Sequence, residues 1–177
     1  MGGGACASSL GRRSVMIDIR VGQGFDIHRF ADAPIEGRVL ILGGVAFPGE
    51  PVLVGHSDAD VVAHAAADAL LGAAGLGDIG QHYPDTDPQW KGADSLAILS
   101  DVAHKVRALG WRIGNIDCSV VCESPRIAPV RDTMVQRLTD AVDAPVSVKG
   151  RRAEGLGAVG RSEGIVCFAS AVIIKES

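Results

Sequence analysis

The sequence predicts a single α/β domain of the α+β kind, and three observations support this prediction. The chain has 177 residues, which is enough for one domain with its own core and too few for two. Hydrophobic residues make up 47% of the chain and charged residues 21%, a balance typical of folded soluble proteins. Segments with strand periodicity alternate with segments that favour helices, and neither an internal repeat nor a linker separates them.

The first part of the domain has the pattern of a strand, two short apolar runs and a helix. Apolar and polar residues alternate over 16–23, which predicts a strand that ends at its glycines and leads into a loop over 25–28. The short apolar runs 39–42 and 51–54 follow. The alanine-rich segment 59–74 strongly favours a helix.

The remaining elements are predicted by caps and periodicity. Asp94 is a good N-cap for a second helix, in which apolar residues recur at three- and four-residue steps until Gly110 stops it. Pro129 suits the first turn of a third helix. Strands are expected over 113–121, 146–149 and 165–174, with glycine-rich loops over 75–88 and 150–164.

Charge, hydropathy and cysteine content exclude several classes of protein. A net charge of −4 argues against binding to the nucleic-acid backbone, which requires a basic face. The sequence lacks an apolar run long enough to span a membrane. The four cysteines form no CxxC pair, so we expect reduced, mostly buried thiols in a cytoplasmic protein. They are Cys6, Cys118, Cys122 and Cys167.

Residues 1–15 differ in composition from the rest of the chain. They are rich in glycine and serine and lack the apolar run of a signal peptide. Two arginines without acidic residues resemble a transit peptide only weakly. We expect 1–15 to be a disordered extension or an upstream start, and 16–177 to form the domain.

Two groups of residues have the chemistry of a metal site. Asp26 and His28 are two positions apart, so in extended backbone their side chains project to the same side. His64 lies in the first expected helix, one turn from Asp60 and one turn from Asp68. Asp26, His28 and His64 would leave an open position on a catalytic zinc, with Asp68 orienting the imidazole of His64. Alternatively, these residues simply solvate two loop ends.

Classical phosphate-binding loops are absent from the sequence. Ile27 stands where a GxGxxG motif requires glycine, and no GxxxxGK[ST] motif occurs. The run His56-Ser57-Asp58 at the expected helix start could bind an anion through free backbone N–H groups. An ordinary N-cap at Ser57 or Asp58 explains the same run equally well.

The segment 149–161 combines four cations with one acid. Lys149, Arg151, Arg152 and Arg161 could hold a diphosphate, with Glu154 as a ligand of a bridging magnesium. A solvated run of charges is the other interpretation.

Four strings carry a resemblance to a known family. They are GQGFDIHRF, LGG with a following proline, HSDADVVAHAAADALLGAAGLGDIGQHYPDTDPQWKGADS and GRSEGI. From about residue 19 to 175 the chain resembles the 2-C-methyl-D-erythritol 2,4-cyclodiphosphate synthase family. The resemblance implies a four- to five-stranded mixed sheet with helices packed on one face. It also implies a homotrimer with sheets around a central apolar channel and active sites between neighbouring subunits.

The resemblance further implies a role for individual residues. Asp26, His28 and His64 match the zinc ligands, one zinc per subunit, and Glu154 would hold magnesium or manganese. His56 would stabilise the transition state, beside Ser57 at the substrate phosphates. The other expected substrate-binding residues are Asp26, Ile27, His28, Asp78, Ile79, Gly80, Tyr83, Pro84, Asp85, Thr86, Asp87, Cys122, Glu123, Ser124, Pro125, Arg126, Ile127, Ala128, Arg151, Arg152, Ala153, Glu154, Ala158 and Arg161.

The implied reaction belongs to the non-mevalonate pathway of isoprenoid synthesis. The 2-phosphate of 4-diphosphocytidyl-2-C-methyl-D-erythritol 2-phosphate attacks the β-phosphorus in line and CMP leaves, a lyase reaction that yields a cyclic diphosphate. No side chain acts as nucleophile, so the enzyme positions the groups and neutralises their charge.

The chain departs from the family pattern in one loop. Arg151-Arg152-Ala153 precedes Glu154 where the family has threonines, and Ala158 replaces a bulky apolar residue. We hypothesise that Arg152 supplies a catalytic charge where threonine supplied a hydroxyl. A catalytically weakened protein is the alternative.

Two other functions are compatible with the same residues. One is a non-catalytic zinc-binding trimer that senses an isoprenoid diphosphate in its channel through Arg161 and Glu163. The other is a metal-dependent phosphohydrolase, which would release free phosphate instead of a cyclic product.

Overall fold

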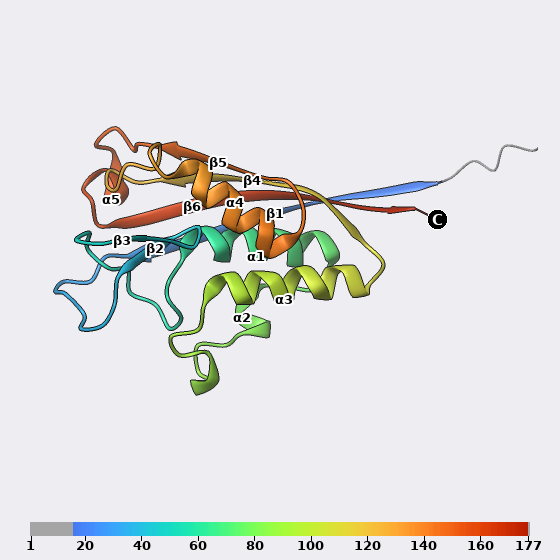
Figure 1. Ribbon diagram of the computed structural model, residues 1–177, viewed down its shortest axis with the longest axis horizontal. Helices are drawn as coiled ribbons and strands as arrows, with labels where there is room; N and C mark the ends of the chain where they lie inside the picture. The colour runs from blue at the N-terminus through green and yellow to red at the C-terminus, as the bar shows by residue number, and fades with distance from the viewer. Residues whose placement is uncertain (1–15, 177) are drawn as a thin grey trace, which may run out of the picture.

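The computed structural model describes residues 16–176, so Cys6 and the expected extension over 1–15 lie outside the described residues. The helices and strands follow in the order β1 Ile17–Arg29, β2 Leu40–Leu42, β3 Val45–Phe47, α1 Val61–Ala74, α2 Ile79–His82, η1 Pro88–Trp90, α3 Ser95–Ala108, β4 Arg112–Val121, α4 Arg131–Val142, β5 Val146–Arg151, α5 Gly157–Gly160 and β6 Gly164–Glu176 (Figure 1). None of the helices in this part of the chain has both the length and the apolar character that crossing a bilayer requires.

The main sheet is mixed and has four strands in the order β1-β6-β4-β5. β6 pairs antiparallel with β1 on one side and with β4 on the other, whereas β5 pairs parallel with β4. The prediction of one mixed α/β domain is therefore confirmed. The apolar run 39–42 contains β2, which forms a separate hairpin with β3 through Gly43 and Gly44, both in the left-handed region.

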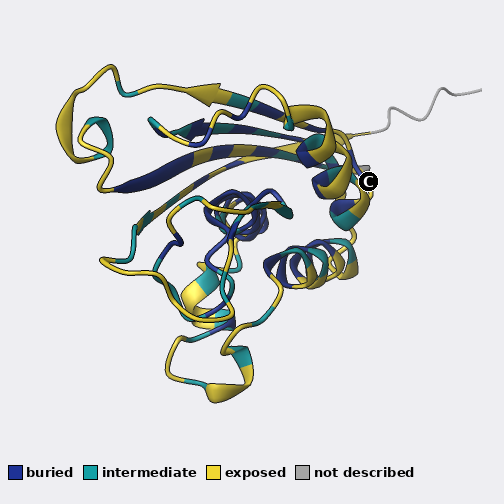
Figure 2. Ribbon diagram, turned by 60° about the vertical axis from the view of Figure 1, so that its left-hand side comes forward, coloured by how far each residue is buried: buried dark blue, intermediate teal, exposed yellow. Residues whose placement is uncertain are grey.

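The helices cover one face of the sheet. α1 lies against β1 and β6, α3 packs on α1, and α4 contacts both α3 and β5. Figure 2 shows α1 as the most completely buried helix, enclosed between the sheet and its neighbours. The face of β1 that points away from α1 is apolar and exposed. Its large apolar side chains are Ile17, Ile19, Val21, Phe25 and Ile27, and the ring of Phe168 in β6 is tilted against that of Phe25.

The expected loop over 25–28 is wrong, because β1 continues to Arg29. β6 remains paired with β1 throughout, with Asp26 opposite Cys167 and His28 opposite Ile165. Gly22 and Gly24 therefore do not end the strand. A Cβ on Gly24 would lie 1.9 Å from the carbonyl oxygen of Ala65, and one on Gly22 would lie 2.0 Å from that of Ala69. The glycines let the backbone of α1 approach β1 closely.

The expected N-cap of the first helix is also wrong. α1 begins at Val61, and Asp60 caps it through the N–H groups of Val62 and Ala63. The Asp60 carboxylate also accepts the N–H groups of Gly43 and Gly44, at 2.8 and 2.7 Å. One fully buried carboxylate thus joins the β2–β3 hairpin to the helix. The single hydroxyl of Ser57 could not accept all of these hydrogen bonds, and Asp58 lies outside the first turn of the helix.

The other predicted elements are confirmed with shifted ends. Asp94 caps α3, as expected, while α4 begins at Arg131 rather than at Pro129. The 75–88 and 150–164 loops contain α2 and α5, which are too short to show a periodicity in the sequence. The run 51–54 contributes only a bridge between Leu53 and Phe30. Cys118, Cys122 and Cys167 are free and buried, as predicted.

Candidate metal centre and cationic pocket

Three side chains from two elements converge on one point between β1 and α1. The Asp26 Oδ2 atom lies 3.0 Å from Nδ1 of His64 and 3.1 Å from Nε2 of His28. The same two imidazole nitrogens are 3.3 Å apart. Asp26 and His28 lie on the face of β1 that also presents Gly22 and Gly24, so the close approach of α1 brings His64 to them.

The donor set of this triad fits a divalent transition metal. Its three ligand atoms all lie within 4.8 Å of one another. The Nδ1 atom of His28 contacts the carbonyl oxygen of Val54 at 2.8 Å, where it can only donate, so in the neutral ring that binds a metal Nε2 presents its lone pair to the triad. One carboxylate and two imidazoles leave a fourth position free, as a catalytic site requires. The prediction that these residues form a candidate metal site is confirmed.

The electrostatics of the triad keep Asp26 charged. Burial alone would raise the pKa of Asp26, but hydrogen bonds with His28 and His64 outweigh it and hold this pKa well below its ordinary range. Burial would lower the pKa of His28, yet its hydrogen bond with Asp26 raises it overall. The Asp26 carboxylate is therefore ionised, and a bound cation would offset its charge.

The two other helical carboxylates do not belong to this site. The Asp60 carboxylate accepts hydrogen bonds from backbone N–H groups of the hairpin and of α1. Asp68 accepts the N–H of Ile79 at 3.0 Å, so it supports the start of α2 instead of orienting the ring of His64 as expected. Burial raises the pKa of both carboxyl groups.

A cavity of about 280 Å³ opens beside the triad. It brings together five of the expected substrate residues with the metal ligands, although they come from separate loops. The Nε2 atom of His56 lies 3.0 Å from the carbonyl oxygen of Asp87, and the Tyr83 hydroxyl donates to Asp101. The lining residues are Asp26, His28, Gly55, His56, Ser57, His64, Ile79, Tyr83, Asp85, Trp90 and Ile98.

The anion site expected at a helix start is not formed by His56-Ser57-Asp58. α1 begins at Val61, so the backbone N–H groups of its first turn are not adjacent to His56. His56 and Ser57 nonetheless line the cavity through their side chains. Trp90 and Ile98 line it too. Neither was expected from the sequence, although an aromatic residue two positions after the PDTDP string was an available signal for Trp90.

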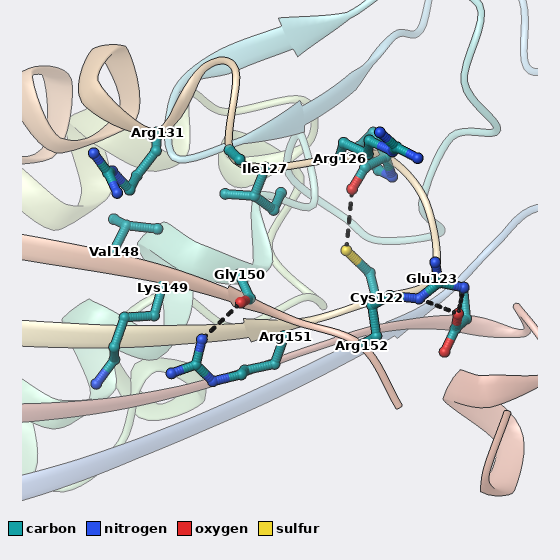
Figure 3. Close-up of a pocket in the computed structure, with 12 residues that line it drawn as sticks. Cys122, Glu123, Arg126, Ile127, Arg131, Val148, Lys149, Gly150, Arg151 and Arg152 are labelled. Carbon is teal, nitrogen blue, oxygen red and sulfur yellow. Dashed lines mark hydrogen bonds and ion pairs between the residues drawn. The ribbon is translucent and has the colours of Figure 1, made fainter. Parts of the chain in front are cut away.

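A second cavity, of about 450 Å³, lies between the 122–131 segment and β5 (Figure 3). Its charges are mostly positive, since five of its residues are cationic and Glu123 is acidic. Burial raises the pKa of the Cys122 thiol to about 11, so this cysteine stays neutral. The lining residues are Cys122, Glu123, Pro125, Arg126, Ile127, Ala128, Arg131, Val148, Lys149, Gly150, Arg151 and Arg152.

Arg152 is held by an acidic partner at the edge of this second cavity. Its Nε donates to Glu123 Oε2 at 3.0 Å, and its Nη2 donates to the same oxygen at 2.5 Å. The other oxygen of Glu123 accepts the N–H of Ala153 at 3.0 Å and that of Gly155 at 3.4 Å. Glu123 therefore stabilises the turn that contains Glu154, whose φ is +54°.

The remaining expected site residues lie outside both cavities. Asp78 and Asp87 cap the short helices α2 and η1. Arg161 follows α5 and pairs with Glu163 at 2.7 Å. Ile27 points to the exposed face of β1. The others outside the two linings are Gly80, Pro84, Thr86, Ser124, Ala153, Glu154 and Ala158.

Comparisons with known proteins agree on one family. The model of the YgbB family matches residues 19–174. The protein named 2-C-methyl-D-erythritol 2,4-cyclodiphosphate synthase in Nostoc sp. is 50% identical over 162 residues, which is 90% of this chain and 96% of the relative. The bifunctional enzyme IspD/IspF of Anaeromyxobacter sp. is 51% identical over 160 residues, 89% of this chain. The chain spans only 40% of that relative's length.

A solved structure has the same fold. The Plasmodium falciparum structure described as an IspF CDP complex superposes with a TM-score of 0.76 at 31% identity, covering 90% of this chain and 97% of that one. Because the family model covers most of the chain and relatives are about half identical to it, the chain belongs to the YgbB family, the family of the 2-C-methyl-D-erythritol 2,4-cyclodiphosphate synthases.

Proposed function

We propose that this protein converts 4-diphosphocytidyl-2-C-methyl-D-erythritol 2-phosphate into 2-C-methyl-D-erythritol 2,4-cyclodiphosphate and CMP. The observation that carries the proposal is the Asp26–His28–His64 triad, which faces a cavity that also contains His56 and Ser57. The separate cationic cavity adds a place for a nucleotide phosphate. The relative from Nostoc sp. carries the name of this activity, and the Plasmodium falciparum relative was solved with CDP.

The reaction needs positioning and charge neutralisation from the protein. An oxygen of the 2-phosphate forms a bond to the β-phosphorus, while the bond from that phosphorus to the bridging oxygen of the α-phosphate breaks. The bridging oxygen and its electron pair leave with CMP. His56 and Ser57 line the cavity, where an imidazole ring and a hydroxyl can contact a phosphate. Zinc held by Asp26, His28 and His64, and magnesium or manganese at Glu154, would supply Lewis-acid polarisation of the phosphate oxygens.

The two cavities share no lining residue within one chain. We propose that a complete site forms between two subunits of a homotrimer. The exposed apolar face of β1 supports this, because Val21 is 69% exposed and Phe25 50%, and a row of large apolar side chains is costly to leave in water. A particle mass equal to one chain, measured by light scattering, would contradict this arrangement.

Incubation of the purified protein with the diphosphocytidyl substrate, zinc and magnesium tests the function. We expect equal amounts of CMP and of a cyclic diphosphate, identified by phosphorus NMR. Release of inorganic phosphate would indicate a phosphohydrolase instead. Metal binding without turnover of the substrate would favour a non-catalytic zinc-binding protein.

Arg152→Thr is expected to lower the turnover of the substrate several-fold. The Arg152 side chain is 65% exposed at the edge of the cationic cavity, where its guanidinium group can turn from Glu123 to a phosphate. The measurement is the rate of CMP release at saturating substrate, with Arg126→Thr as a comparison at the same cavity. An inactive parent together with an active Arg152→Thr variant would refute a catalytic role for Arg152.

A further inference from the structure

The imidazole of His64 has a second set of contacts on the side away from Asp26. Its Nε2 atom lies 2.8 Å from the hydroxyl oxygen of Ser95, the first residue of α3. Ser95 is fully buried. It donates a short hydrogen bond from its hydroxyl to Oδ1 of Asp58, and its backbone N–H donates to Oδ2 of the same carboxylate at 3.1 Å.

The position of the protons follows from these contacts. A carboxylate only accepts hydrogen bonds, so the single hydroxyl proton of Ser95 points to Asp58. The oxygen of Ser95 must then accept a hydrogen bond from His64, which places a proton on Nε2. In the neutral ring, the form that binds a metal, the Nδ1 atom of His64 is left with a lone pair, and this is the atom that lies 3.0 Å from Asp26 within the triad.

The Asp58 carboxylate is itself held in place by backbone. Its Oδ1 accepts the N–H of Asp60 at 3.1 Å, and the N–H of Asp58 donates to the carbonyl oxygen of Ala93 at 3.1 Å. These bonds connect the residues before α1 with those before α3. The orientation of His64 is thus determined by two loops whose residues are more than 30 positions apart.

We propose that Ser95 and Asp58 are positioning residues that hold His64 in the Nε2–H tautomer and aim its Nδ1 at a bound metal. This inference rests on the metal site of the proposed function. Ser57 also contacts the Ser95–His64 pair, because its hydroxyl lies 3.4 Å from that of Ser95 and can donate its proton there. Its hydroxyl oxygen lies 3.0 Å from the same nitrogen but also accepts the N–H of Ala59. An ordered outer partner of a metal-bound histidine contributes about 10- to 100-fold to metal affinity.

Chelator competition with zinc tests the proposal without any measurement of turnover. We expect Ser95→Ala to raise the zinc Kd by about 10- to 100-fold, and Ser95→Thr to recover most of the affinity because the hydroxyl returns. Ser100→Ala removes a hydroxyl from the middle of the same helix and should bind zinc like the parent. Nitrogen-15 NMR of the zinc-loaded parent should show a slowly exchanging Nε2–H on His64 that Ser95→Ala loses.

Asp58→Asn is the second variant, for the case in which Ser95→Ala does not fold. An amide at this position can donate to Ser95, which frees the serine proton for His64 and favours the wrong tautomer, so zinc affinity should again fall. Equal zinc affinity in the parent and in the folded variants would overturn the positioning role while leaving the metal site intact. A parent that takes up no zinc would overturn the proposed function as well.

Discussion

Asp26→Asn is expected to weaken zinc binding by at least about 100-fold and to abolish CMP release. The loss of an outer partner already costs about 10- to 100-fold, and Asp26 is a direct ligand that contacts both imidazoles. The substitution preserves the shape of the side chain and removes its charge. Zinc content per chain and chelator competition measure the effect. Asp18→Asn, the same change on the same strand outside the triad, should match the parent.

The metal-free protein provides an independent measurement of the same carboxylate. The pKa of Asp26 is lowered in the fold, so its contribution to stability is present above its ordinary pKa of 3.8 and is lost as the pH falls through the folded value. The pKa of His28 is raised, so its contribution is present below 6.5 and is lost as the pH rises through its folded pKa. The parent should therefore exceed Asp26→Asn in thermal stability most clearly between pH 3.8 and pH 6.5, the two ordinary pKa values. A stability difference that does not vary with pH would contradict the pairing.

Gly24→Ala is expected to destabilise the fold by about 3 kcal/mol, at the upper end of the range for overpacking. The added Cβ would lie 1.9 Å from the carbonyl oxygen of Ala65 and 2.7 Å from the N atom of Ala69. Both are backbone atoms of α1, so no side chain can rotate away and the helix itself must shift. The same shift would move His64 from Asp26 and weaken metal binding. Chemical denaturation and zinc titration measure the two effects.

Gly72→Ala is the matched control for this substitution. Gly72 lies in α1 and is exposed, and a Cβ added there would meet only the carbonyl oxygen of Gln23 at 3.8 Å. Alanine is favoured over glycine in a helix by roughly 1 kcal/mol, so this variant should be slightly more stable than the parent. If Gly24→Ala were as stable as Gly72→Ala, the close contact between β1 and α1 would not determine the geometry of the triad.

Local patterns in the sequence determined most of the elements and the chemistry of the ligands. The alanine-rich run predicts α1, Asp94 predicts the start of α3, and the two-residue spacing of Asp26 and His28 predicts that both side chains share a face. These inferences succeed because strands and helices repeat every 2 and about 3.6 residues, and a repeat is visible within one segment. The family strings added which of the candidate ligands belong together.

Only the tertiary structure decided how these segments meet. Asp60 rather than Ser57 or Asp58 caps α1 because the N–H groups of Gly43 and Gly44 arrive at its carboxylate from another hairpin. Gly24 resembles a strand end in the sequence but lies against α1 in the fold, and Ser95 contacts His64 across 31 positions of sequence. Such contacts depend on packing between distant segments, which has no period along the chain and so leaves no pattern in the sequence.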